Sequence, residues 1–187
     1  MVTGTSGAGK GTLEKALLAQ MPELELAVSA TTRERRGSEQ DGREYWFISD
    51  EEFDEKLAAG EFLEHVVFPW GQRSGTLRSE IARISARGKI PLLDLEPWGA
   101  LDVKNTVQGA VTIFVEAPSF EENERRLRAR ATESEGEIED RLELAREQLD
   151  QANEFDHLIV NDDFDRALGE LAGIIRKELA TATMSRP

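Results

Sequence analysis

Hydrophobic and polar residues follow two spacings along this chain, and the two spacings alternate. Nearly continuous apolar runs, typical of buried parallel strands, occur at residues 90–95 and 111–115. Apolar residues three or four positions apart, typical of helices, separate such runs. We expect strands at residues 1–3, 26–29, 45–48, 62–68, 90–95, 111–115 and 158–160, and helices at 12–20, 49–59, 76–87, from 119, at 138–149 and at 164–179. This alternation predicts an α/β fold.

Between residues 29 and 75 the regular succession of strand and helix breaks down. The elements there are short and mixed. A serine followed three positions later by glutamate, at residues 49–52, still marks one helix start in this stretch, and residues 119–122 repeat the pattern later in the chain. We therefore expect residues 29–75 to form a lobe inserted into the α/β core.

The glycine-rich segment near the start of the chain carries a specific motif. Residues 4–10 match G-x-x-x-x-G-K between an expected strand and an expected helix. The glycines let backbone N–H groups turn toward phosphate oxygens, the helix N-terminus adds positive potential, and the lysine adds a point charge for the β and γ phosphates. The residues expected to bind phosphate are Gly4, Thr5, Ser6, Gly7, Ala8, Gly9, Lys10, Gly11 and Thr12.

The position after Lys10 departs from the motif, because the usual Mg²⁺-binding serine or threonine is replaced by Gly11. We expect Mg²⁺ to be held by the phosphates, by water and by Thr12. Asp94 is a second candidate ligand, since it ends an apolar run and a second strand usually brings a carboxylate toward the metal. The alternative is that Asp94 only caps a strand end.

Composition and charge exclude several classes of protein. The chain has 187 residues, no cysteine and two histidines, which fits one domain without disulfides, a thiol nucleophile or a thiolate metal site. The net charge of -14 argues against a nucleic-acid or anionic-membrane binder. Neither a membrane-spanning run nor a signal-peptide pattern is present, so we expect a cytoplasmic protein.

Arginine is nevertheless concentrated in two short segments of this acidic chain. Four arginines fall within residues 33–43 and four within residues 125–130. Composition alone leaves two interpretations open, namely anion-binding sites or solvated helix surfaces balanced by neighbouring glutamates.

Several further segments, in order, resemble guanylate kinase, which transfers the γ-phosphoryl group of ATP to GMP. They are residues 28–37 (VSATTRERRG), 41–45 (DGREY), 61–64 (EFLE), 75–76 (GT), 93–100 (LDLEPWGA), 126–130 (RLRAR) and 160–163 (VNDD). The resemblance covers nearly the whole chain. It implies a P-loop kinase fold with a five-stranded parallel core sheet flanked by helices, an inserted mixed α+β GMP-binding lobe and a helical lid. Within this single domain the implied bounds are 1–28, 89–124 and 148–187 for the core, 29–88 for the lobe and 125–147 for the lid.

The resemblance also assigns residues to the guanine base. Glu64 and Glu96 would accept hydrogen bonds from it, and the hydroxyls of Ser29 and Thr76 would donate to it. The chemistry agrees, because guanine presents N1–H and N2–H₂ donors beside an O6 acceptor. Adenine would leave a buried carboxylate unpaired, at a cost of about 1–3 kcal/mol or more.

For the GMP phosphate, the resemblance implies Arg33, Arg36 and Tyr45, and the arginine fork suits phosphate oxygens. The family usually has a second phosphate-binding tyrosine in a Gly-Asn-x-Tyr-Gly-Thr/Ser segment. Here Ser74 takes that position and the segment is one residue longer. We expect Arg73 or Ser74 to replace the lost contact, and the departure leaves a different acceptor open.

At the ATP side, the resemblance implies a lid that neutralises charge on the transferring group and an asparagine, Asn161, near the adenine. Arg126 and Arg130 are four positions apart and share a helix face. The GMP phosphate is already an ionised nucleophile, so catalysis needs positioning and electrostatics rather than a general base. The residues expected to be catalytic are Lys10, Arg33, Arg126, Arg130 and Arg141.

The expected activity is therefore ATP-dependent phosphorylation of GMP, and of dGMP, in purine nucleotide metabolism and GMP recycling. We expect Mg²⁺ with ATP, a monomer or homodimer, and no nucleic-acid or membrane partner. One alternative is a kinase of the same fold acting on a ribose bisphosphate, which would not need Glu64 and Glu96. The other is a non-catalytic guanylate-kinase-like domain that binds phosphopeptides, a class that typically lacks an intact phosphate loop.

The strand expected before the phosphate loop is short. Only three residues precede Gly4, whereas the family's first core strand needs about five. A start codon assigned too late, or a truncated sequence, would account for this.

Overall fold

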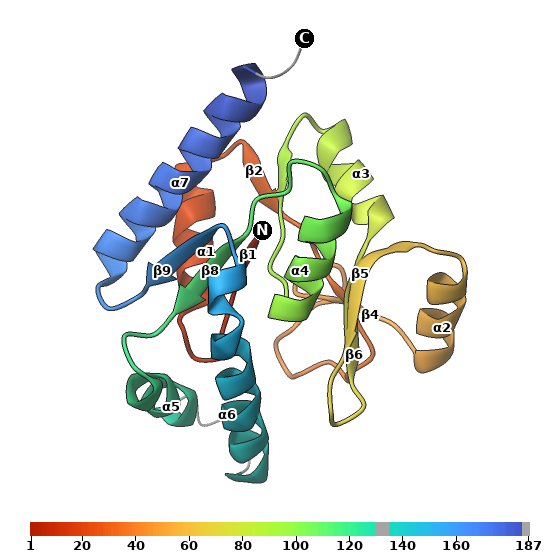
Figure 1. The fold of residues 1–187 in the computed structure, drawn as a ribbon. Helices are drawn as coiled ribbons and strands as arrows, with labels where there is room; N and C mark the ends of the chain where they lie inside the picture. Colours follow the sequence, from red (N-terminus) through yellow and green to blue (C-terminus); the bar gives the residue numbers. More distant parts are fainter. Residues whose placement is uncertain (130–134, 185–187) are drawn as a thin grey trace.

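A computed structural model of the chain describes residues 1–129 and 135–184, and its core is a parallel sheet (Figure 1). β1 (Val2–Gly4), β8 (Ile113–Glu116) and β9 (His157–Val160) pair in parallel, as do β2 (Leu24–Leu26) and β7 (Ile90–Leu92).

Two backbone hydrogen bonds of Val2 join these two groups of strands. The Val2 N–H donates to the Leu93 carbonyl at 2.8 Å, and the Leu95 N–H donates to the Val2 carbonyl at 3.2 Å. The strands of the described core therefore run in the order β2, β7, β1, β8, β9. This is the parallel core sheet expected from the alternating pattern.

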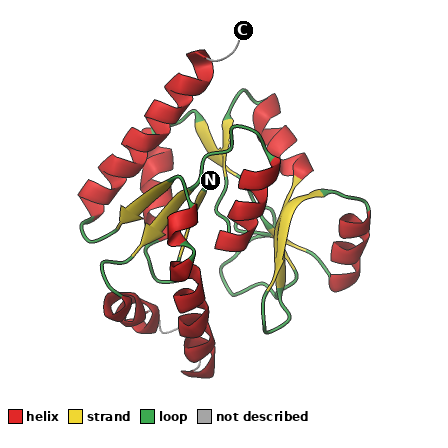
Figure 2. Cartoon of the chain, viewed as in Figure 1, coloured by secondary structure: helices red, strands yellow, loops and turns green. Residues whose placement is uncertain are grey.

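Helices cover both faces of this sheet (Figure 2). α1 (Lys10–Gln20) and α7 (Phe164–Met184) pack together on one face, where Leu13 and Leu171 meet Val115. On the other face lie α3 (Arg78–Ala86) and α4 (Pro97–Thr106), and Phe114 points toward that side. Phe114 and Val115 are adjacent on β8 and therefore pack into hydrophobic cores on opposite faces of the sheet, because successive side chains of a strand alternate between its faces.

A second sheet forms within the predicted lobe. It contains β3 (Ala30–Thr31), β4 (Trp46–Phe47), β5 (Phe62–Val67) and β6 (Arg73–Leu77), in the order β4-β3-β6-β5. β3 pairs with β4 in parallel, whereas β6 pairs antiparallel with both β3 and β5. α2 (Asp50–Ala58) packs on one face of it through Phe53, whose ring stacks on Phe62 at 4.4 Å between centroids.

α5 (Phe120–Ala129) and α6 (Glu135–Asp150) complete the described chain, with a short 3₁₀ turn, Ala152–Glu154, before β9. Leu127 of α5 packs against Ile138 and Leu142 of α6. Both predicted capping serines are confirmed, because Ser49 Oγ accepts from the Glu52 N–H and Ser119 Oγ from the Glu122 N–H. None of the described helices is both long and apolar enough to cross a membrane.

The hydrophobic pattern was wrong about two neighbouring elements. It predicted a helix beginning at residue 76, but Thr76 and Leu77 finish strand β6 and the helix begins at Arg78. The pattern also missed α4, because this helix contains Pro97 and Gly99, which disfavour helices in general. Pro97 is tolerated because it occupies the first turn, where its missing N–H would have no partner in the helix.

We expect Phe53→Ala to lower the free energy of unfolding by about 3–5 kcal/mol, because it empties a fully buried site against Phe62. Denaturant unfolding measures this. Leu57→Ala on the same helix is the matched control, since Leu57 is 38% exposed, and it should cost less than about 1 kcal/mol. Equal losses for the two variants would show that α2 is not held by this core.

Candidate active site

A cavity of about 410 Å³ lies where the two sheets meet. It is lined by residues at the carboxyl ends of three core strands: the phosphate loop after β1, Ala27 and Ser29 after β2, and Asp94 and Glu96 after β7. Open α/β sheets bind ligands at this edge. The second sheet closes the other side through Glu64, Val66 and Ser74.

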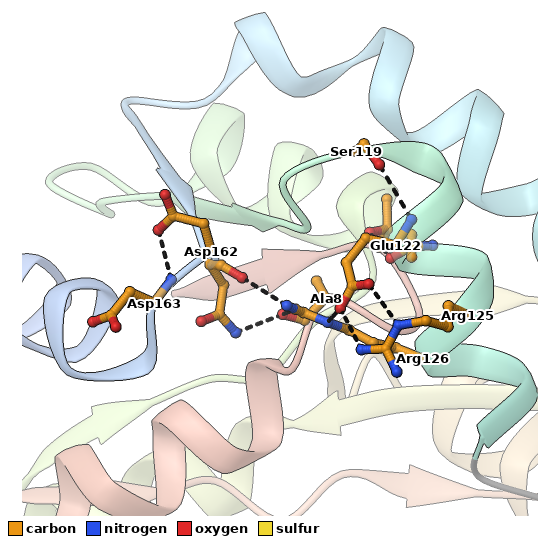
Figure 3. Close-up of polar contacts among 10 residues, drawn as sticks. Ala8, Ser119, Glu122, Arg125, Arg126, Asp162 and Asp163 are labelled. Carbon is orange, nitrogen blue, oxygen red and sulfur yellow. Dashed lines mark hydrogen bonds and ion pairs between the residues drawn. The ribbon is translucent and has the colours of Figure 1, made fainter.

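The phosphate loop is held from behind by α5 and by the residue after β9. The Asn161 side chain donates to the Ala8 carbonyl at 2.8 Å. Arg126 donates to the Asn161 carbonyl at 3.1 Å and to Glu122, and lies against the Ala8 carbonyl (Figure 3). Gly9 has φ 87°, and a Cβ there would lie 2.5 Å from the Asn161 amide nitrogen, so glycine is required.

Lys10 projects from the start of α1 into the cavity and forms an ion pair with Asp94. Burial lowers the pKa of Lys10, but the carboxylates of Asp94, Glu14 and Glu96 outweigh this and raise it above its ordinary value. Sequence reasoning missed Glu14, which is 3% exposed. Burial first, and Asp94 second, raise the pKa of Glu14 to about 8. The sequence signal for the burial of Glu14 was its position next to Leu13, on the side of the helix that faces the core.

The predicted phosphate-binding residues Arg33, Arg36 and Tyr45 all line the cavity. The Arg33 guanidinium lies 5.0 Å from the centre of the Tyr45 ring. Burial and Asp94 raise the pKa of Tyr45, and Arg33 and Lys10 lower it. The phenol of Tyr45 is therefore protonated near neutral pH and able to donate a hydrogen bond within the cavity.

Sequence reasoning did not find Glu39, which holds this arginine-rich loop together. Arg33 donates to both Glu39 oxygens, at 2.7 and 2.6 Å, and the Arg36 N–H donates to Glu39 at 2.8 Å. These hydrogen bonds, first that from Arg33, lower the pKa of Glu39 to about 2. The available signal was its position between Arg36 and Arg43, although a glutamate among arginines is also typical of a solvated surface.

Glu64 and Glu96 lie in the same cavity, at the N-terminus of α4. A register shift in β5 between Phe62 and Glu64 turns Phe62 into the α2 core and Glu64 toward the cavity. Glu64 accepts a hydrogen bond from the Thr76 N–H at 2.8 Å. Its other oxygen would lie only 2.4 Å from a Cβ added at Gly99, so a residue larger than glycine would collide with it. Burial is the main reason that the pKa of each carboxyl is raised.

Arg73 lies on the opposite face of the second sheet, away from the cavity. Residues 73, 75 and 77 of β6 face α2, whereas 74 and 76 face the other way. Arg73 pairs with Asp50 and Asp54 and stacks over Phe53 at 4.6 Å. Ser74 lines the cavity. Of the two residues expected to replace the missing tyrosine, the fold therefore brings only Ser74 to the site.

Several other expected residues lie beside the cavity rather than lining it. Thr12 is exposed on α1, and Thr76 is buried behind Glu64. Arg141 does line the cavity and donates to Ser6 Oγ at 3.4 Å. Arg130 lies outside the described residues. The lining residues that were not anticipated include Phe68, Trp70 and Gln148.

We expect the Arg33–Glu39 pair to stabilise the fold in a pH-dependent way. The pKa of Glu39 falls from 4.5 to about 2 on folding, so its contribution is present above pH about 4.5 and is lost as the pH falls toward 2. The stability difference between wild type and Glu39→Gln, measured in urea, should therefore shrink on acidification from about pH 6 to about pH 3. Glu34→Gln, at an exposed position in the same loop, should show no such trend; a constant difference for Glu39→Gln would contradict the expectation.

Comparison with known proteins agrees with this geometry. A family profile described as guanylate kinase matches residues 1–178. The guanylate kinase of Symbiobacterium thermophilum is 44% identical over 180 residues, which cover 96% of this chain and 85% of the relative. That of Trichormus variabilis is 46% identical over 168 residues, or 90% of this chain and 84% of the relative. The crystal structure of guanylate kinase from Anaplasma phagocytophilum superposes with a TM-score of 0.75 at 28% identity, covering 95% of this chain and 85% of that one. The chain belongs to the guanylate kinase family.

Proposed function

We propose that this protein transfers the γ-phosphoryl group of ATP to GMP, and to dGMP, giving ADP and the corresponding diphosphate. The observation that carries the proposal is one cavity that combines the phosphate loop and Lys10 with two carboxylates, Glu64 and Glu96, and an arginine-rich loop. The relatives that are 44% and 46% identical to this chain are named guanylate kinase. A ribose bisphosphate would leave both carboxylates unpaired, and a phosphopeptide-binding domain would not need Lys10.

The guanine base is proposed to bind at the end of the cavity that holds Glu64 and Glu96. Burial raises the pKa of both carboxyls, which means that an unpaired carboxylate is costly there. The N1–H and N2–H₂ donors of guanine relieve that cost, and adenine presents no matching pair. Ser29 lines the cavity and is the hydroxyl proposed for O6, and Thr76 supports Glu64 from behind.

The acceptor phosphate is proposed to bind Arg33, Arg36 and Tyr45, with Ser74 in place of the family's second tyrosine. Glu39 holds the Arg33 guanidinium and the Arg36 backbone, so the loop is ordered before substrate arrives. Preorganised cations need no rearrangement at the moment of transfer.

At the donor end, the phosphate loop and Lys10 hold the β and γ phosphates. Arg141 reaches this end from α6, whereas Arg126 braces the loop through Ala8 and Asn161. An oxygen of the acceptor phosphate forms a bond to the γ-phosphorus while the bond from that phosphorus to the β–γ bridging oxygen breaks, and ADP leaves. The attacking oxygen is already ionised, so the arginines and Lys10 act through charge alone.

Mg²⁺ is proposed to arrive with ATP rather than to occupy a protein cage. No group of three or more metal-ligating side chains occurs among the described residues. Asp94 lines the cavity beside Lys10 and offers one carboxylate, which suits a metal that usually takes one or two carboxylates plus substrate phosphates. When bound, the metal neutralises charge on the phosphates. Thr12 does not line the cavity, and its role stays a prediction.

We further propose that residues 29–88 act as the acceptor lobe and residues 125–147 as the lid. Closure of both over the two nucleotides would exclude water, which otherwise competes as an acceptor of the phosphoryl group.

A panel of acceptors with ATP and Mg²⁺ tests the proposed reaction. We expect turnover with GMP and dGMP, and kcat/KM lower by at least about 100-fold with AMP or a ribose bisphosphate, because those acceptors leave buried carboxylates unpaired. Lys10→Ala should abolish most of the activity by removing charge at the transferring phosphate. Lys15→Ala, at an exposed position on the same helix, is the control and should remain active. Preferred turnover of a ribose bisphosphate would overturn the proposal.

The replacement for the missing tyrosine has its own test. Ser74→Ala should raise the KM for GMP by roughly threefold to tenfold, the value of a single hydrogen bond. Arg73→Ala should leave that KM unchanged while lowering stability, because Arg73 joins β6 to α2. The reverse pattern in steady-state kinetics and thermal unfolding would return the role to Arg73.

A further inference from the structure

Gln148 makes a contact with the base-binding end of the cavity that the sequence motifs do not explain. It lies near the end of α6 and is 1% exposed. Its side-chain amide donates to Glu96 Oε2 at 2.8 Å, and both residues line the cavity. Glu96 is the N-cap of α4 but makes no side-chain cap hydrogen bond.

Within the described residues, the side-chain amide of Gln148 is hydrogen-bonded through its nitrogen and not through its oxygen. The Gln148 carbonyl oxygen is buried and has no hydrogen-bond partner in the described part of the chain. A buried polar atom without a partner destabilises a fold. Gln148 therefore costs stability on one side of its amide while it holds Glu96 with the other.

The same face of α6 reaches the opposite end of the cavity. Arg141, Leu144 and Gln148 are three and four positions apart, so they share one helix face, and all three line the cavity. Arg141 lies 3.4 Å from the Ser6 hydroxyl in the phosphate loop. One helix thus contacts the donor end of the cavity through Arg141 and the acceptor end through Gln148.

We propose that Gln148 is a positioning residue for guanine recognition: it holds one oxygen of Glu96 so that the other faces the base, and it links that orientation to the position of α6. This inference rests on the proposed function. A donor nucleotide that draws Arg141 toward its phosphates also fixes Gln148. Donor binding therefore tightens acceptor binding, and by linkage the acceptor tightens the donor by the same factor.

The test uses Gln148→Met, which keeps the length of the side chain and removes the amide. We expect the KM for GMP to rise about tenfold, which corresponds to the loss of a hydrogen bond to a charged group, with a smaller change in kcat. The preference for GMP over inosine monophosphate, which lacks the 2-amino group, should narrow. The melting temperature should not fall, since the substitution also removes the unpartnered carbonyl. Gln151→Met, three positions further on and outside the cavity lining, should change none of the kinetic values.

Coupling is measured separately by calorimetry. In wild type, a non-hydrolysable ATP analogue should tighten GMP binding several-fold, and this gain should shrink in Gln148→Met. Gln148→Leu, a smaller apolar side chain, should behave in the same way and guards against a packing artefact of methionine.

Two kinds of result would overturn the inference. One is an unchanged KM for GMP with an unchanged preference over inosine monophosphate in an active enzyme. The other is a lower melting temperature with equal losses for both nucleotides, which would give Gln148 a structural role. If wild type itself does not phosphorylate GMP, the proposed function fails first, so the two failures are distinguishable.

Discussion

The active site depends on backbone hydrogen bonds along both edges of β1. On one edge Val2 exchanges hydrogen bonds with Leu93 and Leu95, and on the other β1 pairs with β8. Because the strands are parallel, their carboxyl ends meet at one edge, and Lys10 and Asp94 come together there although they are 84 positions apart. A shift of β1 by one residue would turn its side chains to the opposite faces and move the phosphate loop away from Asp94.

The acceptor end of the cavity depends on the register shift in β5. It lets Phe62 and Glu64 face opposite sides of the lobe sheet, although residues two apart normally share a face. Phe62 then anchors α2, while Glu64 meets the N-terminus of α4 beside Gly99. The lobe core and the base-binding carboxylate are thus built from the same short strand.

The two arginine clusters of an acidic protein have acidic partners within the fold. Arg33 is held by Glu39, and Arg126 by Glu122. The interpretation that glutamates balance the arginines is therefore confirmed for these two pairs. That the first cluster binds an anion stays a proposal, supported by the position of Arg33 and Glu39 in the cavity lining. Preorganising a cation with a carboxylate sacrifices some attraction for phosphate but fixes the direction in which the cation points.

The sequence by itself determined the α/β class, the capping serines and the phosphate-loop motif, because these follow from local spacing and residue chemistry. The other residues expected at the cavity came from the resemblance to the guanylate kinase family. The sequence pattern did not determine α4, the strand β6, or which of Arg73 and Ser74 faces the site. Those depend on long-range pairing: the register of β6 against β5 and β3 decides which side each residue takes. The contact of Gln148 was likewise decided only by the tertiary structure, whereas Glu39 binds Arg33 and Arg36 within a single loop. Nothing in the local sequence marks Gln148 as the donor to Glu96. The two residues are 52 positions apart, and only the fold brings them together.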